Sequence, residues 1–448
     1  MDLFLNFAGK SLTPCFTLPM RSPHFRLASS LLTVACLLPT LPSCTLVATK
    51  PARNPTDHVF VRYWPAPEGS LKLAVKDFID IKGQVTSAGS AYLAKNNPPA
   101  EKDAACLRLA RARGVHIVGK TNASEFGVTS SGVNPHFGTP RSPLTDRKHR
   151  VISGGSSSGS AVSVATGMAD VAFGTDTGGS VRIPAACCGV YGLKTTYGLV
   201  SLKGVFPMSP KHLDTVGPLA KTIPNLATGM SLLKAGFEDE YAEARAEHPS
   251  GRSLRVGRLY VDGTDPEIDR AIDSALKKSG FRIVKLDKAF KDAWDQAQKD
   301  GLTIAVGDAW TNDEPYSNKR GVSSVTKATI LLGRIEHLTG GYEAALKRKA
   351  AWQRILRRTF GRVDLIALPT LKQMPPAIPR FGGSALFEAV TFSLQNTVSF
   401  NYSGNPAIAI PVPVQGKEVP VTSLQLVGPR LSEAELLNAG RIVSSKRL

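Results

Sequence analysis

Short apolar runs alternate along this chain with segments whose apolar residues recur at helical spacing. Residues 71–81 alternate between apolar and polar side chains and lead to Gly83, a pattern typical of a strand that passes into a loop. Residues 104–113 carry apolar side chains at helical spacing, and the apolar run 115–118 behind them predicts a buried strand. This β–α–β order predicts an α/β protein.

The same order continues in the second half of the chain. Residues 254–260 and 282–286 predict strands, with a helix over 266–278 between them. Residues 343–360 predict a long amphipathic helix that leads into a strand over 363–368. We find no internal repeat and no change of composition along this part of the chain, so we expect a single large domain.

Two clusters of glycine and serine, residues 154–160 and 174–180, enclose a small and apolar segment, residues 161–173. A flexible linker would be rich in glycine and serine throughout, so we expect a folded stretch with a helix in its apolar middle. Glycines at turns allow positive φ and let backbone N–H groups converge on one point. Converging N–H groups beside a serine are what an acyl-transfer enzyme needs to stabilise an oxyanion.

A serine nucleophile needs a base, which is usually a histidine. The chain has eight histidines, none of them in a recognisable triad motif. The alternative base is a lysine that burial keeps neutral, and Lys76 is the candidate because it ends an apolar predicted strand. A G-x-S-x-G pattern centred on Ser157 and an S-x-x-K pattern over 231–234 lack the expected surroundings, and we interpret both as chance matches.

The amino-acid composition and charge bear on which kinds of partner this protein binds. Hydrophobic residues make up 42% and charged residues 20%, as in ordinary globular proteins. The net charge of +19 is unusual, but no basic run with interleaved aromatics accompanies it. We interpret it as solvated helix faces and expect no nucleic-acid partner. Cys106, Cys187 and Cys188 lack metal-ligand spacing, so we expect buried thiols, no metal and no cofactor.

The first 45 residues differ from the rest. A basic segment that starts at Met20 precedes an apolar run, residues 27–41, and a small residue stands directly before Cys44. This order is typical of a secretory signal, and it also resembles a bacterial lipoprotein signal with Cys44 as the lipidated residue. We therefore expect a signal or lipoprotein-like segment over 1–45, with Met20 as an alternative start, and a linker over 46–68. The protein would then be exported, either periplasmic or tethered to the membrane; if the segment is no signal, it is cytoplasmic.

The Gly/Ser stretch resembles the signature of the amidase signature hydrolases. The match covers both clusters and continues through residues 182–186 and 189–194. Further matching segments follow the order of the family along the chain: 73–83, 118–127, 212–220, 364–370, and the C-terminal NYSGNPAIAIP and LQLVGPR. The resemblance implies an α/β/α amidase signature fold with a central mixed β-sheet flanked by helices, as one catalytic domain over 69–448.

The resemblance also implies the roles of individual residues. Ser180 corresponds to the nucleophile, Ser156 to a bridging serine that follows a cis peptide bond, and Lys76 to the base. The implied oxyanion hole consists of backbone N–H groups of residues 177–180, which are Thr177, Gly178, Gly179 and Ser180. We further expect Asn122 and Thr175 to line the substrate pocket, Lys120 to be structural, and Asp176 and Arg182 to brace the loop.

The activity implied is that of an amidase, which hydrolyses the carbon–nitrogen bond of a small or peptide-like amide through an acyl-serine intermediate. One alternative is the A subunit of the tRNA-dependent amidotransferase, which shares the fold. That subunit typically has Arg-Gln-Pro where this chain has Arg182-Ile183-Pro184, and Ser-Ser-Leu-Asp-Gln where this chain has residues 211–215. Another alternative is a relative that binds without catalysis, although all three reactive residues are present.

Overall fold

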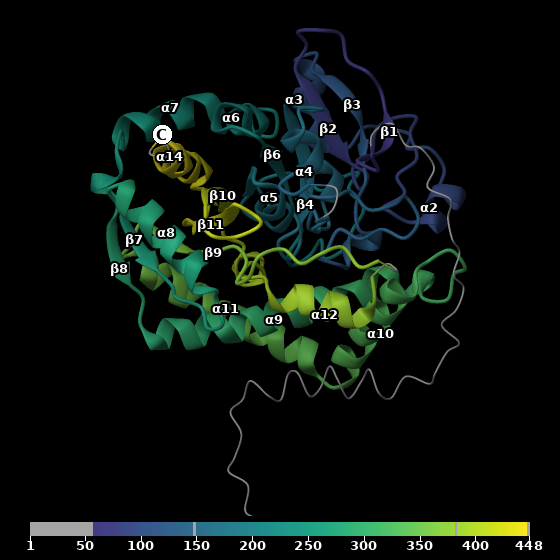
Figure 1. Ribbon diagram of the computed structural model, residues 1–448. Helices are drawn as coiled ribbons and strands as arrows, with labels where there is room; N and C mark the ends of the chain where they lie inside the picture. Colours follow the sequence, from purple (N-terminus) through teal and green to yellow (C-terminus); the bar gives the residue numbers. More distant parts are fainter. Residues whose placement is uncertain (1–56, 147–148, 381–382, 446–448) are drawn as a thin grey trace, which may run out of the picture. The chain divides into compact units, whose positions relative to one another are not determined.

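One sheet of eleven strands runs through the part of the chain that the computed structural model describes, residues 57–146, 149–380 and 383–445 (Figure 1). In their order across the sheet, the strands are β1 (Phe60–Tyr63), β3 (His116–Thr121), β2 (Lys72–Lys76), β4 (Val171–Asp176), β6 (Thr215–Ala220), β5 (Tyr191–Lys194), β10 (Ala407–Pro413), β11 (Val421–Val427), β9 (Leu365–Pro369), β7 (Arg255–Arg258) and β8 (Arg282–Lys285).

The strand directions make the sheet mixed, as expected. Strand β2 is parallel to both of its neighbours, β3 and β4, and β7 is parallel to both β8 and β9. The remaining pairs are antiparallel. Polar side chains at the carboxyl ends of β2 and β4 therefore meet at one edge of the sheet, which is where ligands bind in open α/β sheets.

Helices connect and cover the strands. They are α2 (Ala91–Asn96), α3 (Arg108–Ala112), α4 (Ser158–Ala165), α5 (Arg182–Cys188), α6 (Ile223–Ser231), α7 (Phe237–Glu247), α8 (Pro266–Lys278), α9 (Lys288–Asp313), α10 (Ser324–Leu338), α11 (Gly341–Phe360), α12 (Ala385–Ser393), α13 (Val398–Ser403) and α14 (Glu433–Ser444). Side-chain caps begin several of them, such as the Asp287 carboxylate, which accepts the Phe290 N–H at the start of α9.

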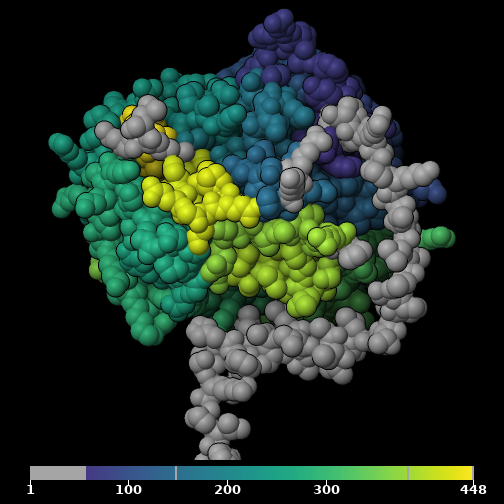
Figure 2. Space-filling model, viewed as in Figure 1, coloured from purple at the N-terminus to yellow at the C-terminus, as the bar shows by residue number. Residues whose placement is uncertain are grey.

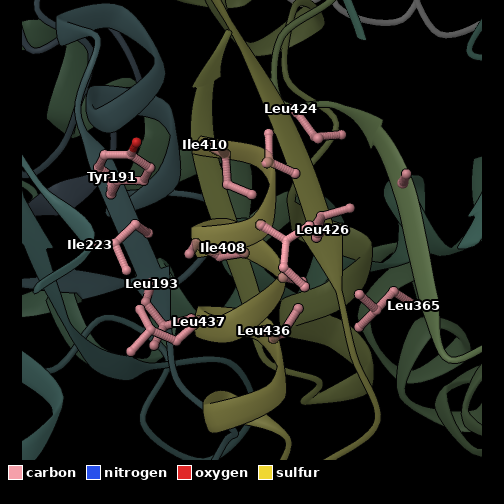
Figure 3. Close-up of a cluster of buried hydrophobic side chains, with 14 of the residues drawn as sticks. Tyr191, Leu193, Ile223, Leu365, Ile408, Ile410, Leu424, Leu426, Leu436 and Leu437 are labelled. Carbon is pink, nitrogen blue, oxygen red and sulfur yellow. The ribbon is translucent and has the colours of Figure 1, made fainter. Parts of the chain in front are cut away.

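Hydrophobic clusters occupy both faces of the sheet. Because successive strand residues point to opposite faces, Leu365 of β9 packs into one cluster and its neighbour Ile366 into the other. The first cluster packs β5, β9, β10 and β11 against α6, α8 and α14, and includes Leu193, Ile408 and Leu437 (Figure 3). The second packs the opposite face against α9, α11 and α13. Helices on both faces confirm the α/β/α architecture.

The C-terminal part of the chain completes the middle of the sheet. Strands β10 and β11 insert between β5 and β9, which come from earlier and separate parts of the sequence. In the space-filling view, the yellow C-terminal residues accordingly adjoin both the blue and the green parts of the chain (Figure 2).

Two expectations differ from the structure. The apolar segment 161–173 does not form one helix: α4 ends at Ala165, and β4 begins at Val171. Small residues allow α4 to pack closely, but the run Val171–Phe173 is buried in the sheet, where side chains pack against both faces. In the expected linker 46–68, residues 60–63 instead form β1, which pairs with β3.

The expected signal segment, residues 1–45, lies outside the described residues. Within the described ranges, no helix is long and apolar enough to cross a membrane. Cys106, Cys187 and Cys188 are all buried and unpaired, and burial raises the pKa of the Cys106 and Cys187 thiols to about 12. These three thiols are therefore protonated near neutral pH.

Candidate active site

Lys76 stands at the carboxyl end of β2 with its side chain fully buried. Its Nζ donates to Ser156 Oγ and to Thr175 Oγ1, each at 2.7 Å. Burial lowers the pKa of this amine from 10.5 to about 7, although the carboxylates of Asp176 and Asp214 oppose the shift. The apolar strand thus places Lys76 in contact with a serine, in buried surroundings that favour the neutral form of its amine.

Backbone hydrogen bonds to the segment 124–130 hold Ser156 in place. The Gly155–Ser156 peptide bond is cis, as the resemblance implied. The Ser156 carbonyl accepts the Ser124 N–H at 3.1 Å, and the Gly155 N–H donates to the Ser130 carbonyl at 2.7 Å. A Cβ on Gly155 would lie 2.5 Å from Ser124 Oγ, so only glycine permits this close approach.

Ser180 lies in the loop that joins β4 to α5. Its carbonyl accepts the Ser157 N–H at 3.2 Å, which brings this loop beside the segment that carries Ser156. The Ser180 side chain is half-buried, and its hydroxyl has no hydrogen-bond partner among the residues that the structure describes. Gly179 adopts φ +134°, and a Cβ there would clash with Thr397 Oγ1, so the loop requires glycine at this position.

The Asp176 carboxylate organises the same loop. It forms two hydrogen bonds with the guanidinium of the fully buried Arg182, at 3.0 Å to Nε and 2.9 Å to Nη2. It also accepts backbone N–H groups of Gly179 at 2.8 Å and Val181 at 3.1 Å. The Arg182 charge and these hydrogen bonds hold the pKa of Asp176 well below its usual range, despite its burial. The structure thus forms the ion pair that we expected to brace the loop.

The expected oxyanion donors are not equivalent. The Gly179 N–H is engaged by Asp176, whereas the N–H groups of Thr177, Gly178 and Ser180 donate to no group in the described part of the chain. Free N–H groups at the turn are available to a substrate oxygen, and the engaged one is not.

A cavity opens at this point of the sheet. Its polar lining includes Ser156, Thr175, Thr177 and Asp214. Its apolar lining comes mainly from the segments around residues 78 and 202–208, namely Phe78, Leu202, Val205, Phe206 and Met208. Thr175, one of the two residues expected to line the substrate pocket, thus lines this cavity.

Asn122 does not line this cavity. Its side-chain nitrogen donates to the carbonyls of His58 and Gly138, and its oxygen accepts the Ala123 N–H at 2.8 Å. The side chain is fully buried and joins separate loops, and the expected role of Asn122 in substrate binding stays a prediction. No sequence pattern indicates that the Asn122 side chain forms hydrogen bonds with these backbone groups.

The sequence did not select the individual residues of the apolar wall, nor Asp214. The Asp214 carboxylate accepts Thr177 Oγ1–H at 2.6 Å and the backbone N–H of Met208 and Ser209. Asp214 belongs to the matching segment 212–220, which was the one available signal. The wall residues, such as Phe206, show no motif that distinguishes them from core residues.

The alternative catalytic patterns are not arranged for catalysis. Ser157 is fully buried and donates to the Thr175 carbonyl at 3.3 Å. Ser231 donates to carbonyls within α6, and Lys234 pairs with Glu240. A chance match explains both patterns.

His212 lies beside a carboxylate and a serine without forming a triad. Its Nδ1 lies 2.9 Å from Asp308 Oδ2, but Ser209 Oγ donates to the same carboxylate oxygen rather than to the imidazole. A triad requires the serine on the other side of the histidine.

In the described ranges, no group of three or more His, Cys, Asp or Glu side chains is placed to hold a metal ion.

A protein-family model described as Amidase matches residues 70–437 of this chain. The match spans the whole sheet except β1 and includes Lys76, Ser156 and Ser180. Together with the α/β/α fold and the Gly/Ser signature, it shows that the chain belongs to the amidase signature family.

Individual relatives point to several members of that family. The chain is 32% identical over 419 residues to the A subunit of the glutamyl-tRNA(Gln) amidotransferase of Halobacterium salinarum, covering 84% of this chain and 95% of that protein. It is 34% identical over 385 residues to the 2-amino-5-chloromuconic acid deaminase of Comamonas testosteroni, covering 83% and 80%. A solved structure described as an amidase matches with a TM-score of 0.68 and 27% identity, covering 84% of both chains.

Proposed function

We propose that this protein is an amidase that hydrolyses the carbon–nitrogen bond of a small or peptide-like amide through an acyl-serine intermediate. The observation that carries the proposal is the buried Lys76 amine, 2.7 Å from Ser156 Oγ and beside the loop of Ser180. Burial that lowers the pKa of the amine to about 7 supplies the neutral base that this chemistry needs.

In the proposed mechanism, Ser180 is the nucleophile and Ser156 passes its proton. Neutral Lys76 accepts the Ser156 hydroxyl proton while Ser156 accepts the proton of Ser180, whose oxygen attacks the amide carbon. The proton then returns through Ser156 to the leaving amine, and the carbon–nitrogen bond breaks. Water next takes the place of the amine, gives up its proton to the same relay and releases the acid.

The oxyanion of the tetrahedral intermediate would lie at the turn after β4. The N–H groups of Thr177, Gly178 and Ser180 are the donors that support this, since they have no other acceptor in the described residues. Gly179 contributes through its backbone conformation, because its N–H is held by Asp176. Donors fixed before the reaction stabilise developing charge without reorganisation.

The relatives also support a competing proposal, an amidotransferase A subunit that works with partner subunits. The similarity to the Halobacterium protein favours it. The sequence differences at Ile183 and in residues 211–215 favour the amidase, since that subunit typically has other residues there. An amidase needs no partner subunit to hydrolyse its substrate, which separates the two proposals.

The N-terminal pattern adds a proposal about location. We propose that residues 1–45 direct export and that the protein acts in the periplasm or as a lipoprotein tethered through Cys44. The basic segment, the apolar run and the position of Cys44 support this.

The test uses the purified chain alone and a panel of simple aliphatic and aromatic amides. We expect hydrolysis of some of them, measured as released amine or ammonia, and its loss in Ser180→Ala. Glutamine hydrolysis that appears only after addition of amidotransferase partner subunits would favour the competing proposal instead. Ligand binding without turnover of any amide would favour a non-catalytic relative.

A further inference from the structure

The last residue of α9, Asp313, is a buried carboxylate that the proposed mechanism does not use. Its side chain is fully buried. Neither Oδ1 nor Oδ2 has a hydrogen-bond partner among the residues that the structure describes. Burial of an unpartnered polar group costs free energy, and such groups are rare in native proteins unless they have a function.

Asp313 lies near the cavity, behind residues that line it and not among them. The side chain of its neighbour Asn312 donates to the Met208 carbonyl at 3.0 Å, and Met208 lines the cavity. Ala309, one turn earlier and on the same face of α9, packs in a cluster with Phe78 of the cavity wall. Asp313 is also close enough to Asp214, another lining residue, for the two carboxylates to repel each other.

Aromatic rings connect the cavity to the end of α9. Phe206 of the cavity wall packs against Phe78, with ring centroids 5.6 Å apart, and against Phe126 at 5.5 Å. Phe126 in turn packs against Tyr316 at 5.1 Å, and Tyr316 is close enough to Asp313 to interact with its charge. Aromatic faces beside a carboxylate are the surroundings that bind organic cations.

The two acids near this cavity contrast in sign with the net positive charge of the whole protein. The chain carries a net charge of +19, yet Asp214 and Asp313 stand here as buried acids. No described basic side chain forms an ion pair or a hydrogen bond with Asp313, and burial and the Asp214 charge raise the pKa of its carboxyl well above the usual value.

We propose that Asp313 and the adjoining aromatic wall form a subsite for a protonated amine of the substrate. This inference rests on the proposed amidase function and names its substrate class: amides that carry an ammonium group several bonds away from the scissile carbonyl. The ammonium group supplies hydrogen bonds to Asp313 and favours its ionised form, and the carbon chain contacts Phe206 of the cavity wall.

The first experiment compares matched amides that differ only in a terminal ammonium or methyl group. The pairs are 4-aminobutanamide and pentanamide, 5-aminopentanamide and hexanamide, and 6-aminohexanamide and heptanamide. We expect at least one pair to show kcat/KM higher by about tenfold or more for the ammonium compound, since a charged hydrogen bond discriminates at this level. Asp313→Asn should lower that ratio at least tenfold, and Glu314→Gln, at an exposed neighbour, should not change it.

The second experiment does not depend on turnover. Calorimetric titration of n-butylammonium into Ser180→Ala should show binding that becomes at least tenfold weaker in Ser180→Ala/Asp313→Asn. Because Asn removes an unpaired buried acid, the thermal midpoint of the Asp313→Asn variant should not fall.

The two experiments separate the inference from the function on which it rests. Hydrolysis of neutral amides that depends on Ser180, without an ammonium preference in any pair, would overturn the subsite and leave the amidase proposal intact. No hydrolysis of any amide, combined with n-butylammonium binding that requires Asp313, would overturn the amidase proposal and leave the subsite. Binding that is equally strong with and without Asp313 would overturn the subsite in either case.

Discussion

The Asp77 carboxylate lies 3.0 Å from the Lys120 ammonium, although Asp77 directly follows Lys76 in the sequence. Lys120 also donates to the Val85 carbonyl and to Thr86 Oγ1, and its side chain is fully buried. Successive strand residues point to opposite faces, so Asp77 leaves the Lys76 side of the sheet and pairs with the other lysine. These two lysines therefore differ: Lys120 forms an ion pair with a carboxylate, whereas the Lys76 Nζ donates only to hydroxyl oxygens and burial lowers the pKa of its amine.

The carboxylates that act on Lys76 do not include Asp77, its neighbour in the sequence. The opposing carboxylates are instead Asp176 and Asp214, and burial outweighs both, so the pKa of Lys76 is about 7.

The first prediction concerns the pH dependence of the reaction. Below pH 7, Lys76 is an ammonium group that cannot accept a proton, so kcat/KM on one neutral amide should rise about tenfold per pH unit and level off above about pH 7. Lys76→Ala should lower kcat/KM by roughly 10²–10⁴-fold, the usual effect of removing a general base. Lys76→Arg should be no better than Lys76→Ala, because a guanidinium does not give up its proton.

Two controls make this measurement decisive. His212→Asn should keep the shape of the pH profile, since the imidazole bonds to Asp308 and not to a reactive serine. Lys76→Arg with most of the parent activity would show that the Lys–Ser–Ser relay is wrong for this protein.

The second prediction concerns the nucleophile. A fluorophosphonate probe should label Ser180, as peptide mass spectrometry would show, and Ser180→Ala should abolish both labelling and turnover. The fold should persist, because Gly179 and the Asp176–Arg182 pair set the loop rather than the Ser180 hydroxyl. Ser157→Ala is the matched control: its hydroxyl is fully buried on the Thr175 carbonyl, so labelling should continue in this variant. Labelling that survives in Ser180→Ala but disappears in Ser157→Ala would reverse the assignment.

Much of the architecture could be predicted because local patterns and tertiary packing agree. The helix over Pro266–Lys278 and the strands on either side of it were predicted almost to the residue, since apolar spacing and an acidic cap coincide there. The segment 161–173 was not, because small apolar residues suit both a closely packed helix and a buried strand. Only pairing with β2 and β6 shows where the strand begins.

Site residues that belong to a sequence motif could be predicted, and site residues that only long-range packing brings together could not. Lys76 and Ser156 were selected from their motifs, and the structure places them in contact. Phe206 and Asp313 were not selected as individual residues, because their positions depend on how residues 202–208 and the end of α9 meet. The same limit applies to the hydrogen bonds of Asn122, whose partners lie in loops 16 to 64 residues away.

The third prediction concerns export. In the native host, the mature protein should begin at or near Cys44, because the basic segment and apolar run precede it as in a cleaved signal. Mass spectrometry of the purified native protein measures the N-terminal residue and any attached lipid. Cys44→Ala separates the two versions: it should abolish a lipid modification but permit cleavage of an ordinary signal. A cytoplasmic protein that retains Met1 would overturn the export proposal.

The fourth prediction concerns the buried ion pair that braces the loop of Ser180. Asp176→Asn keeps the size of the side chain but leaves the fully buried Arg182 without its counter-charge, so the free energy of unfolding should fall by about 3–5 kcal/mol. The Gly179 and Val181 N–H groups also lose a charged acceptor, and fluorophosphonate labelling of Ser180 should slow in protein that is still folded. Urea denaturation measures the first effect and labelling kinetics the second. Asp292→Asn removes an exposed pair with Lys288 and should change neither, since exposed pairs contribute little. Equal stability of Asp176→Asn and Asp292→Asn would mean that the Asp176–Arg182 pair does not hold the loop.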